Sequence, residues 1–518
     1  MKEQLDFRVS PKKAFNEEEF ALFIEREFGE NAPLYELSKR SIDARKRDVI
    51  VLLRFVLKKE QEVWNKGLLQ NVAKATEVHI IGSGPAGIFA GIRMIELGLK
   101  PIIFERGNDV KDRRRDLANI NKNHIVNPDS NYCFGEGGAG TYSDGKLYTR
   151  SKKRGDVNRV LEIMVAHGAT KNILIDAHPH IGTNKLPKLI ADMRESIKSC
   201  GGEVHFNSKL TDLEISSDEI TSITINGNET IKTKAVLLAT GHSARDIFEL
   251  LEKKKIEIEA KPFALGVRVE HPQNIIDKIQ YKCTTDRSEY LPASSYGLVS
   301  QIHYQGTNHG VFSFCMCPGG FIVPSATQDK EIVVNGMSPS KRDSKYANSG
   351  IVVAVDEQDF APFNKHGNLR AMYYQQAVEQ KMYEVVAQGQ VAPAQRLTDF
   401  VHNVNSTNLP ETSYQPGLAP TNLRDALPDK VQRVLKEGFK SFGNKMRGYM
   451  TDEAIVVGTE SRTSSPVKIP REKEEKYHIR IKNLFPSGEG AGYAGGIMSA
   501  AIDGEKVADA ISIKLTNY

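Results

Sequence analysis

Residues 78–87 read VHIIGSGPAG, an apolar run that leads directly into three glycines. The spacing of Gly82, Gly84 and Gly87 is that of the dinucleotide-binding turn between a strand and a helix. In such a turn the first glycine permits the tight bend and the second lets the backbone approach a pyrophosphate. The third allows the helix to pack closely on the strand. This stretch therefore predicts the start of a βαβ unit.

The residues that follow supply the rest of that unit. A helix is predicted from Ile88 to about Leu97, where Gly98 stops it, and its positive N-terminal end would face phosphate. A second apolar run, residues 101–104, ends at Glu105, whose carboxylate would hold ribose hydroxyls. Strand, turn, helix, second strand and acid occur in order, which separates this motif from a chance glycine pattern.

Composition describes an ordinary globular protein. The 518 residues are 40% hydrophobic and 26% charged, and the length predicts two or three domains. A net charge of +5 gives no general argument for a nucleic-acid or membrane partner. Five cysteines without disulfide or zinc spacing indicate a reducing compartment, and we expect no metal site. With neither a signal peptide nor a membrane-spanning apolar run, we expect a cytoplasmic protein without a membrane partner.

Residues 1–74 predict a small N-terminal α+β module. Its predicted strands lie near residues 5–10, 35–42 and 49–57. Asn16, with Glu19 three residues later, marks the start of a helix. The turn between the last two strands carries Arg45, Lys46 and Arg47, with Lys39 and Arg40 nearby. Such a cluster could contact phosphate, although a solvated turn is the more common interpretation.

The rest of the chain predicts one discontinuous domain with another inserted in it. Residues 75–255 alternate strand and helix, as in a doubly wound, Rossmann-like α/β sheet. Residues 256–454 change to short β-like runs mixed with helices, which indicates an inserted α+β substrate domain with a proline-broken loop at 410–428. Residues 455–518 return to a strand, a glycine-rich loop and a helix over 498–511, and complete the first domain.

Two later segments share the small residues of the first turn. The strand over residues 235–238 ends in Ala239, Thr240 and Gly241, at the sheet edge where ligands bind in such folds. Residues 486–497 read PSGEGAGYAGGI and lead into the last helix. Small residues at both places let the backbone lie against a dinucleotide. His242, next in the chain, could bind phosphate or flavin, cap a helix or face solvent.

Together these three segments resemble the FAD domain of the glutathione-reductase-like flavoprotein superfamily. From about residue 76 to the end, the chain more closely resembles a bacterial family of uncharacterised FAD-dependent dehydrogenases. The blocks that carry this resemblance are FGEGGAGTYSDGKL at 134–147, CMCPGG at 315–320, TESRTSSPV at 459–467 and GEGAGYAGGI at 488–497. The resemblance implies non-covalently bound FAD.

The resemblance also implies which residues line FAD. Leu210, in the edge strand after Asn207, would offer its backbone to adenine, and Glu489 would take the place of the aspartate that often binds the ribityl chain. The last helix, opened by Gly495 and Gly496, would stabilise the anionic reduced flavin with its positive end. The predicted cofactor-binding residues are Gly82, Gly84, Pro85, Ala86, Gly87, Glu105, Arg106, Gly137, Gly138, Leu210, Ala239, Thr240, Gly241, Gly488, Glu489, Gly495, Gly496 and Ile497.

No catalytic residue is singled out by the sequence. The candidate proton donors are Tyr142, Lys146, Arg462 and Tyr493, within or beside glycine-rich blocks. A polar residue in such a loop more often holds the loop or the cofactor, and a catalytic role requires reach to substrate. Cys315 and Cys317 alternate along a strand and could face one cavity. They lack the spacing of thioredoxin-like motifs, so small buried hydrophobes are the favoured interpretation.

We therefore expect a FAD-dependent oxidoreductase, a dehydrogenase that passes hydride between flavin N5 and a small organic substrate under the inserted domain. A looser resemblance to bile-acid and fumarate-type reductases suggests reduction of an unsaturated compound. The Asp-Gly motif of the aromatic hydroxylases is not seen beside Arg462. NAD(P)H or another redox partner would donate electrons transiently. The alternatives are a flavoprotein that acts on or binds RNA through the N-terminal basic turn, and a non-catalytic FAD-binding regulator.

Overall fold

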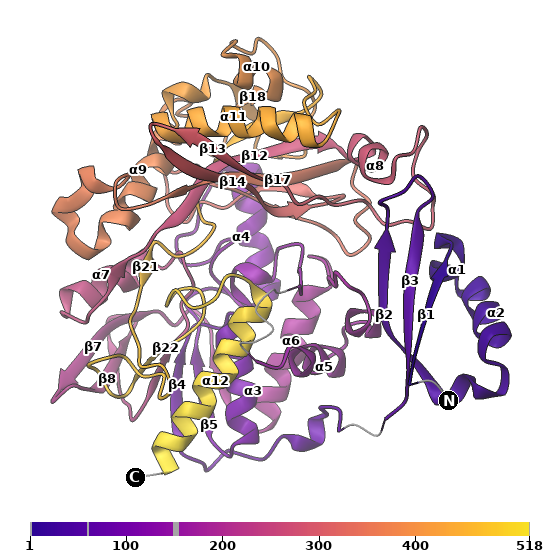
Figure 1. The fold of residues 1–518 in the computed structure, drawn as a ribbon. Helices are drawn as coiled ribbons and strands as arrows, with labels where there is room; N and C mark the ends of the chain where they lie inside the picture. The colour runs from indigo at the N-terminus through magenta and orange to yellow at the C-terminus, as the bar shows by residue number, and fades with distance from the viewer. Residues whose placement is uncertain (1–2, 60–61, 149–154, 517–518) are drawn as a thin grey trace.

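A computed structural model describes residues 3–59, 62–148 and 155–516. The chain has a mixed α/β fold in three parts (Figure 1). An N-terminal module stands at one side, a parallel sheet with its helices forms the lower part of the view, and a larger sheet lies across the top. The candidate site lies between the last two parts.

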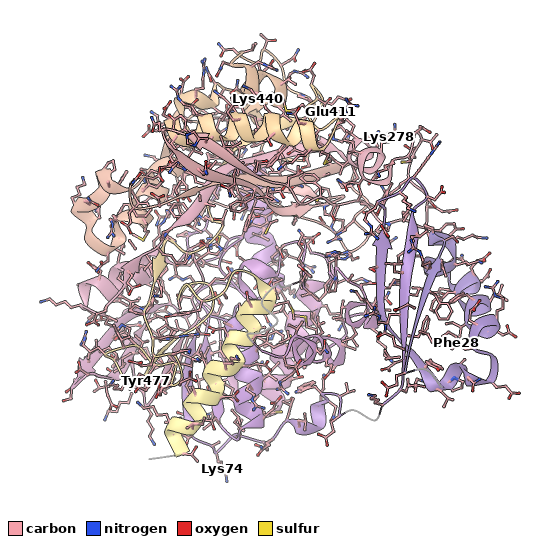
Figure 2. The ribbon with its side chains drawn as sticks, in the orientation of Figure 1. Phe28, Lys74, Lys278, Glu411, Lys440 and Tyr477 are labelled. Atoms are coloured by element: carbon pink, nitrogen blue, oxygen red, sulfur yellow. The ribbon has the colours of Figure 1, made fainter. Side chains whose placement is uncertain are left out.

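The N-terminal module is a three-stranded antiparallel sheet with two helices. Its strands β1 (Gln4–Val9), β2 (Tyr35–Asp43) and β3 (Ile50–Leu57) lie in the order β1-β3-β2, with helices α1 (Pro11–Phe15) and α2 (Glu17–Phe28). The three predicted strands are confirmed. Asn16 caps α2 as predicted, since its side-chain oxygen accepts from the N–H of Glu19 at 3.0 Å. Phe28 packs against Phe55 of β3 in the small core (Figure 2).

The edge strand β2 attaches this module to the rest of the chain. Arg40 exchanges two backbone hydrogen bonds with residues 175–177, at 2.8 and 2.9 Å. Its guanidinium also pairs with Asp176 at 2.8 Å, and Arg45 pairs with Asp43 at 2.7 Å. Arg45 in the basic turn and Arg40 in the strand beside it are thus engaged by the protein itself, which favours the structural interpretation of that turn.

The second part is built on a five-stranded parallel sheet. Its strands are β4 (Glu77–Ile81), β5 (Lys100–Phe104), β6 (Glu203–His205), β10 (Val236–Leu238) and β22 (Leu484–Pro486), in the order β22-β10-β4-β5-β6. Helix α3 (Pro85–Glu96) connects β4 to β5, which confirms the predicted βαβ unit. Because β22 pairs with β10, the sheet combines four strands from residues 77–238 with one strand from residues 484–486.

The two faces of this sheet are covered differently. Helices α3, α5 (Val157–Ala166), α6 (Leu186–Ser199) and α12 (Ile497–Thr516) share the core of one face. Against the other face lie helix α7 (Arg245–Lys253) and a three-stranded antiparallel sheet, β7 (Leu210–Ser216), β8 (Glu219–Ile225) and β9 (Glu229–Lys232). A doubly wound sheet predicts helices on both faces. The difference arises because residues 210–232 form three strands rather than a helix, and in β8 exposed and buried side chains alternate over residues 219–222.

The inserted domain holds a seven-stranded sheet in the order β13-β14-β17-β12-β20-β18-β19. These strands are β12 (Phe263–Pro272), β13 (Val299–Tyr304), β14 (Thr307–Cys317), β17 (Tyr346–Val355), β18 (Ala392–Arg396), β19 (Leu418–Pro420) and β20 (Ile455–Glu460). Its helices are α9 (Arg370–Glu384), α10 (Leu397–His402) and α11 (Asp429–Lys445), and α11 lies across the outer side of the sheet (Figure 1). Other elements are α4 (Val110–Asn123), α8 (Gln273–Tyr281), β11 (Glu259–Ala260), β15 (Phe321–Pro324), β16 (Val334–Met337) and β21 (Val467–Lys468).

The sheet of the inserted domain continues past residue 454, where the sequence predicts the insertion to end. Strand β20 pairs with β12 and β18, so it belongs to this sheet. All six of its residues are buried, including Thr459 and Glu460, and a short buried strand carries no signal for which sheet it joins. None of the helices in the described ranges has the length and apolar character needed to cross a bilayer.

Close packing of α3 on its strand predicts the effect of a methyl group at Gly87. A Cβ there would lie 2.0 Å from the carbonyl oxygen of Gly82, a backbone atom that cannot move aside cheaply. We expect Gly87→Ala to lose about 1–3 kcal/mol of stability or more, measured by thermal unfolding. The control Gly297→Ala places its Cβ more than 4 Å from the described atoms and should stay within about 0.5 kcal/mol of wild type. Equal unfolding curves for the two variants would contradict the packing described.

Candidate functional site

An elongated pocket follows the carboxyl edge of the parallel sheet and ends beneath the inserted domain. Its lining includes the ends of β4, β5 and β10, the loop before α12, and residues of β14 and β16. The volume of the cavity is about 320 Å³. Small-molecule pockets usually have roughly 300–1,000 Å³, so this cavity is of ordinary size for a ligand site.

The structure gathers the predicted cofactor-binding residues around this pocket. All of them except Gly87 and Gly137 belong to its lining. Gly87 lies behind the turn, where it allows α3 to contact the strand. Gly137 has a φ of +76° and shapes the following loop, because a Cβ there would lie 1.9 Å from Thr141 Oγ1. These two glycines therefore act on the backbone that forms the pocket.

The first turn presents bare backbone to the pocket. A Cβ on Gly82 would lie 2.4 Å from the carbonyl oxygen of Ala239, so the turn fits only without a side chain. Gly84 is the N-cap of helix α3, and no side chain of the described residues caps the first N–H groups of the helix. An uncapped N-terminus that opens on a pocket is a ready site for phosphate.

Three glycines of the other two segments border open space, whereas Gly490 contacts backbone, since a Cβ there would lie 2.5 Å from the carbonyl oxygen of Gly241. At Gly241, Gly495 and Gly496, an added Cβ would find no described atom within 4 Å, although all three residues line the pocket. Side chains at these positions would project into space that the protein leaves empty. The residues present therefore fit a large ligand with a phosphate centre, such as a dinucleotide.

Glu105 joins three loops at the end of β5. Its Oε2 accepts from the N–H and the hydroxyl of Ser83, both at 2.9 Å. Its Oε1 accepts from the N–H groups of Gly107 and Gly135, at 3.0 and 2.9 Å. A carboxylate has about four acceptor sites, so a ribose hydroxyl would take the place of the Ser83 hydroxyl, which can rotate away.

An ion pair that the sequence did not reveal supports the second glycine loop. The Asp503 carboxylate accepts from the N–H of Gly488 at 2.8 Å and pairs with Arg471 at 2.6 Å. Arg471 in turn lies 3.9 Å from the centroid of the Tyr493 ring, and its N–H donates to the Tyr493 hydroxyl at 3.1 Å. Tyr493, a candidate proton donor, therefore packs on Arg471 and is not part of the pocket lining.

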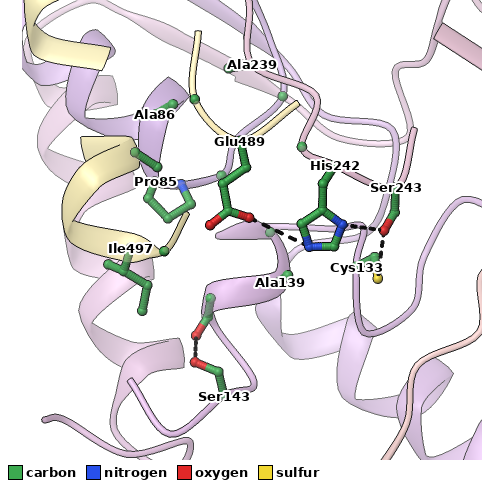
Figure 3. Close-up of a pocket in the computed structure, with 18 of the residues that line it drawn as sticks. Pro85, Ala86, Cys133, Ala139, Ser143, Ala239, His242, Ser243, Glu489 and Ile497 are labelled. Carbon is green, nitrogen blue, oxygen red and sulfur yellow. Dashed lines mark hydrogen bonds and ion pairs between the residues drawn. The ribbon is translucent and has the colours of Figure 1, made fainter. Parts of the chain in front are cut away.

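A chain of polar side chains crosses one wall of the pocket (Figure 3). Glu489 lies 3.6 Å from His242, whose Nδ1 is 2.8 Å from the hydroxyl of Ser243. That hydroxyl is 3.5 Å from the sulfur of Cys133. Burial lowers the pKa of His242, so its imidazole is neutral at pH 7. His242 faces Glu489 within the pocket rather than solvent.

Of the four candidate proton donors, two line the pocket. Tyr142 lies outside it, because its hydroxyl donates to the carbonyl oxygen of Val110 at 2.8 Å. Arg462 lines it but donates to Glu379 at 2.9 and 3.1 Å and to Thr327 at 2.9 Å. Burial alone would lower the pKa of Arg462, but Glu379 outweighs it and raises the pKa, so this guanidinium cannot serve as an acid.

Lys146, Cys315 and Cys317 all line the end of the pocket that lies beneath the inserted domain. The Lys146 ammonium is 3.8 Å from the sulfur of Cys317, and both cysteines line the pocket. The strand is irregular here, since its pairing shifts after Phe314 and Cys315 has a φ of +42°. Cys317 is buried as expected, whereas Cys315 is exposed on the pocket, so the expectation of two buried cysteines is wrong for Cys315. Desolvation nevertheless raises the pKa of the Cys315 thiol to about 12. A thiol at neutral pH is a weak nucleophile, which favours the non-redox interpretation.

Comparison with known proteins identifies two family segments and one close relative. Residues 262–463 match the family described as FAD-dependent protein, C-terminal domain-like, and residues 1–57 match a domain of unknown function, DUF8436. An uncharacterized protein of Clostridium beijerinckii is 39% identical over 497 residues, which is 92% of each chain.

Among solved structures the likeness is distant. CtdE in complex with FAD is 12% identical, with 85% of this chain and 84% of that chain covered and a TM-score of 0.32. Tetracycline destructase Tet(51) is 12% identical over 86% of this chain and 83% of that chain, with a TM-score of 0.33. The flavin-dependent brominase Bmp2 is 13% identical over 86% of this chain and 80% of that chain, with a TM-score of 0.35. Scores this low carry no inference about function.

Glu505, on the helix that follows the second glycine loop, predicts a pH dependence of stability. Burial raises its pKa to about 7, although Arg159 lies 2.9 Å away. The pKa is 4.5 when the group is unperturbed, so the folded state binds the proton more tightly. This contribution to stability is therefore complete below about pH 4.5 and declines as the pH rises through about 7.

We expect Glu505→Gln, which stays neutral, to gain thermal stability relative to wild type as the pH is raised from about 5 to about 8. The Tm of both proteins across this range measures the effect. The control Glu437→Gln alters an exposed pair with Lys440 and should follow wild type at each pH. Parallel curves for wild type and Glu505→Gln would contradict the assignment.

Proposed function

The chain belongs to the same family as the Clostridium beijerinckii protein and matches the FAD-dependent protein C-terminal domain, and on this premise we propose that it is a FAD-dependent oxidoreductase. FAD would bind non-covalently in the elongated pocket, in a domain of the glutathione-reductase-like type. Bound there, it would supply a hydride acceptor and donor at flavin N5.

The continuity of the pocket carries this proposal. The first turn, the end of β10 and the loop before α12 all line one cavity, although they are far apart in sequence. The uncapped N-terminus of α3 supports a pyrophosphate at the middle of that cavity. The loop at Gly495 and Gly496 supports the flavin end, since it is bare of side chains and opens α12.

The inserted domain supplies the other wall of the flavin end. Phe314, Cys315 and Cys317 of β14 line the pocket there, opposite residues 143–146 of the glycine-rich loop. A substrate in this space would be covered from solvent on the side away from the cofactor. We propose reduction of an unsaturated compound, with hydride added to one carbon and a proton to its neighbour. A reduced nicotinamide or a redox protein would return the electrons, because the sequence carries a single dinucleotide fingerprint.

Gly84 offers a direct test of the cofactor. Its φ of −70° suits any residue, and an added Cβ would lie 4.0 Å from the Cα of Gly138, so the fold tolerates alanine. The methyl group would lie between the backbones of Gly84 and Gly138, both of which line the pocket. We expect purified wild-type protein to hold FAD stoichiometrically, and Gly84→Ala to bind FAD at least about tenfold more weakly, by fluorescence titration.

The Tm of the cofactor-free Gly84→Ala protein should remain that of wild type, and Gly297→Ala should bind FAD normally. Wild-type protein without flavin absorbance, and without gain on adding FAD, would contradict the proposal.

A second test separates an enzyme from a binding protein. Anaerobic photoreduction of the FAD-loaded protein, followed by mixing with activated alkenes, should give reoxidation of the flavin together with a saturated product. NADH or NADPH should then sustain turnover. Reduced flavin that no unsaturated acceptor reoxidises would contradict the reductase assignment and favour the regulatory alternative.

A further inference from the structure

The pocket end beneath the inserted domain carries a positive charge that has no role in binding the proposed cofactor. Its lining there consists of Ser143, Asp144, Gly145, Lys146, Tyr148, Phe314, Cys315, Cys317, Asn335 and Gly336. These residues differ from those at the end predicted for adenine, which is lined by Phe104, Ser208 and Leu210. The cationic side chains of the lining show what kind of molecule this end can hold.

Two of the cations that line the described pocket are already neutralised. Arg106 donates to both carboxylate oxygens of Asp246, at 2.7 and 2.8 Å, and lies 4.5 Å from the Phe134 ring centroid. Arg462 directs its guanidinium at Glu379 and Glu331. Both guanidinium charges are therefore already paired with carboxylates.

Lys146 differs from both arginines. Its Nζ is 3.4 Å from Asp144 and 3.8 Å from the sulfur of Cys317, both long contacts for an ammonium with three donors. Asp144 is also held by Arg342, at 2.5 and 3.1 Å, so two cations share one carboxylate. Since 37% of the Lys146 side chain is exposed, it is accessible from the pocket that it lines.

This surplus charge is permanent at neutral pH. Burial by itself would lower the pKa of Lys146, but Cys317 and Asp144 outweigh it and the pKa is raised. His180 adds no cation, since burial, reinforced by Arg342, lowers its pKa. Lys146 is therefore a poor proton donor, because it holds its proton, and a stable partner for a negative charge.

Resting on the function proposed above, we propose that the substrate of this pocket carries a carboxylate, and that the Lys146 ammonium binds it. The single charge of an ammonium matches that of a carboxylate, whereas a phosphate monoester carries a charge of about −1.5 to −2 at neutral pH. The apolar part of the substrate would lie against Phe314 of β14. Lys146 would then fix the position of the molecule relative to the cofactor.

Matched ligands of different charge test this assignment. Benzoate and trans-cinnamate, benzamide and cinnamamide, and phenyl phosphate are titrated into FAD-loaded protein, with flavin absorbance and calorimetry as readouts. We expect wild type to bind the carboxylates at least about tenfold more tightly than the amides. Lys146→Met should lose that preference while its amide affinity changes by less than about threefold.

Control variants distinguish a binding role from a structural one. Lys146→Arg keeps the cation and should retain the preference for carboxylates. Lys345→Met removes an exposed lysine paired with Glu411 on the surface and should behave as wild type. If the Lys146→Met protein is less stable, its unchanged amide affinity still shows that the pocket is formed.

Each remaining outcome decides the inference. Equal binding of carboxylates and amides by wild type, a preference that survives in Lys146→Met, or no binding of any ligand would overturn it. Tighter binding of phenyl phosphate, lost in Lys146→Met, would replace the carboxylate with a phosphate ester and overturn the carboxylate assignment. A protein that takes up no FAD fails the proposed function, and calorimetry with the same ligands and variants then tests Lys146 separately.

Discussion

Backbone contact between the first turn of α3 and the segments around it is the constraint on which the pocket depends. A Cβ on Gly504 of α12 would lie 2.1 Å from the carbonyl oxygen of Ala86, and one on Gly82 would lie 2.4 Å from that of Ala239. Glycine is therefore required at these two contacts. Because the contacts are made by backbone, the strand ends and helix starts come close enough to line one cavity with N–H groups rather than side chains.

Buried charges connect the two walls of that cavity. Arg245 of α7, on the parallel-sheet side, pairs with Glu331 and Glu379 of the inserted domain, at 2.9 and 2.7 Å. Arg462 joins the same carboxylates after β20. Buried ion pairs are weak evidence of stability, because desolvation offsets their attraction. Their directional hydrogen bonds instead orient the inserted domain over the pocket. They also occupy Arg462, so that Lys146 is left as the available cation among the described residues that line the pocket.

Local signals in the sequence predict local structure well, and long-range partners poorly. The βαβ unit, the N-terminal strands and the last helix follow from glycine spacing, capping and periodicity within short windows. The antiparallel sheet over 210–232 and the place of β20 depend on which distant strand is available, which no window contains. The orientation of polar side chains in the glycine-rich loops also depends on distant partners. Tyr142 bonds to Val110 and Tyr493 to Arg471, so both lie outside the pocket lining. Lys146 lies beside Cys317 and lines the pocket.

The central claim is that two glycine loops at opposite ends of the chain hold the two ends of one FAD molecule. A crystal structure of the protein with FAD tests it most directly. We expect adenine beside Leu210, the pyrophosphate at the N-terminus of α3, and the isoalloxazine between Gly138 and Gly496 with its open face toward Lys146. FAD bound outside this pocket, or with its isoalloxazine at the Leu210 end, would contradict the claim.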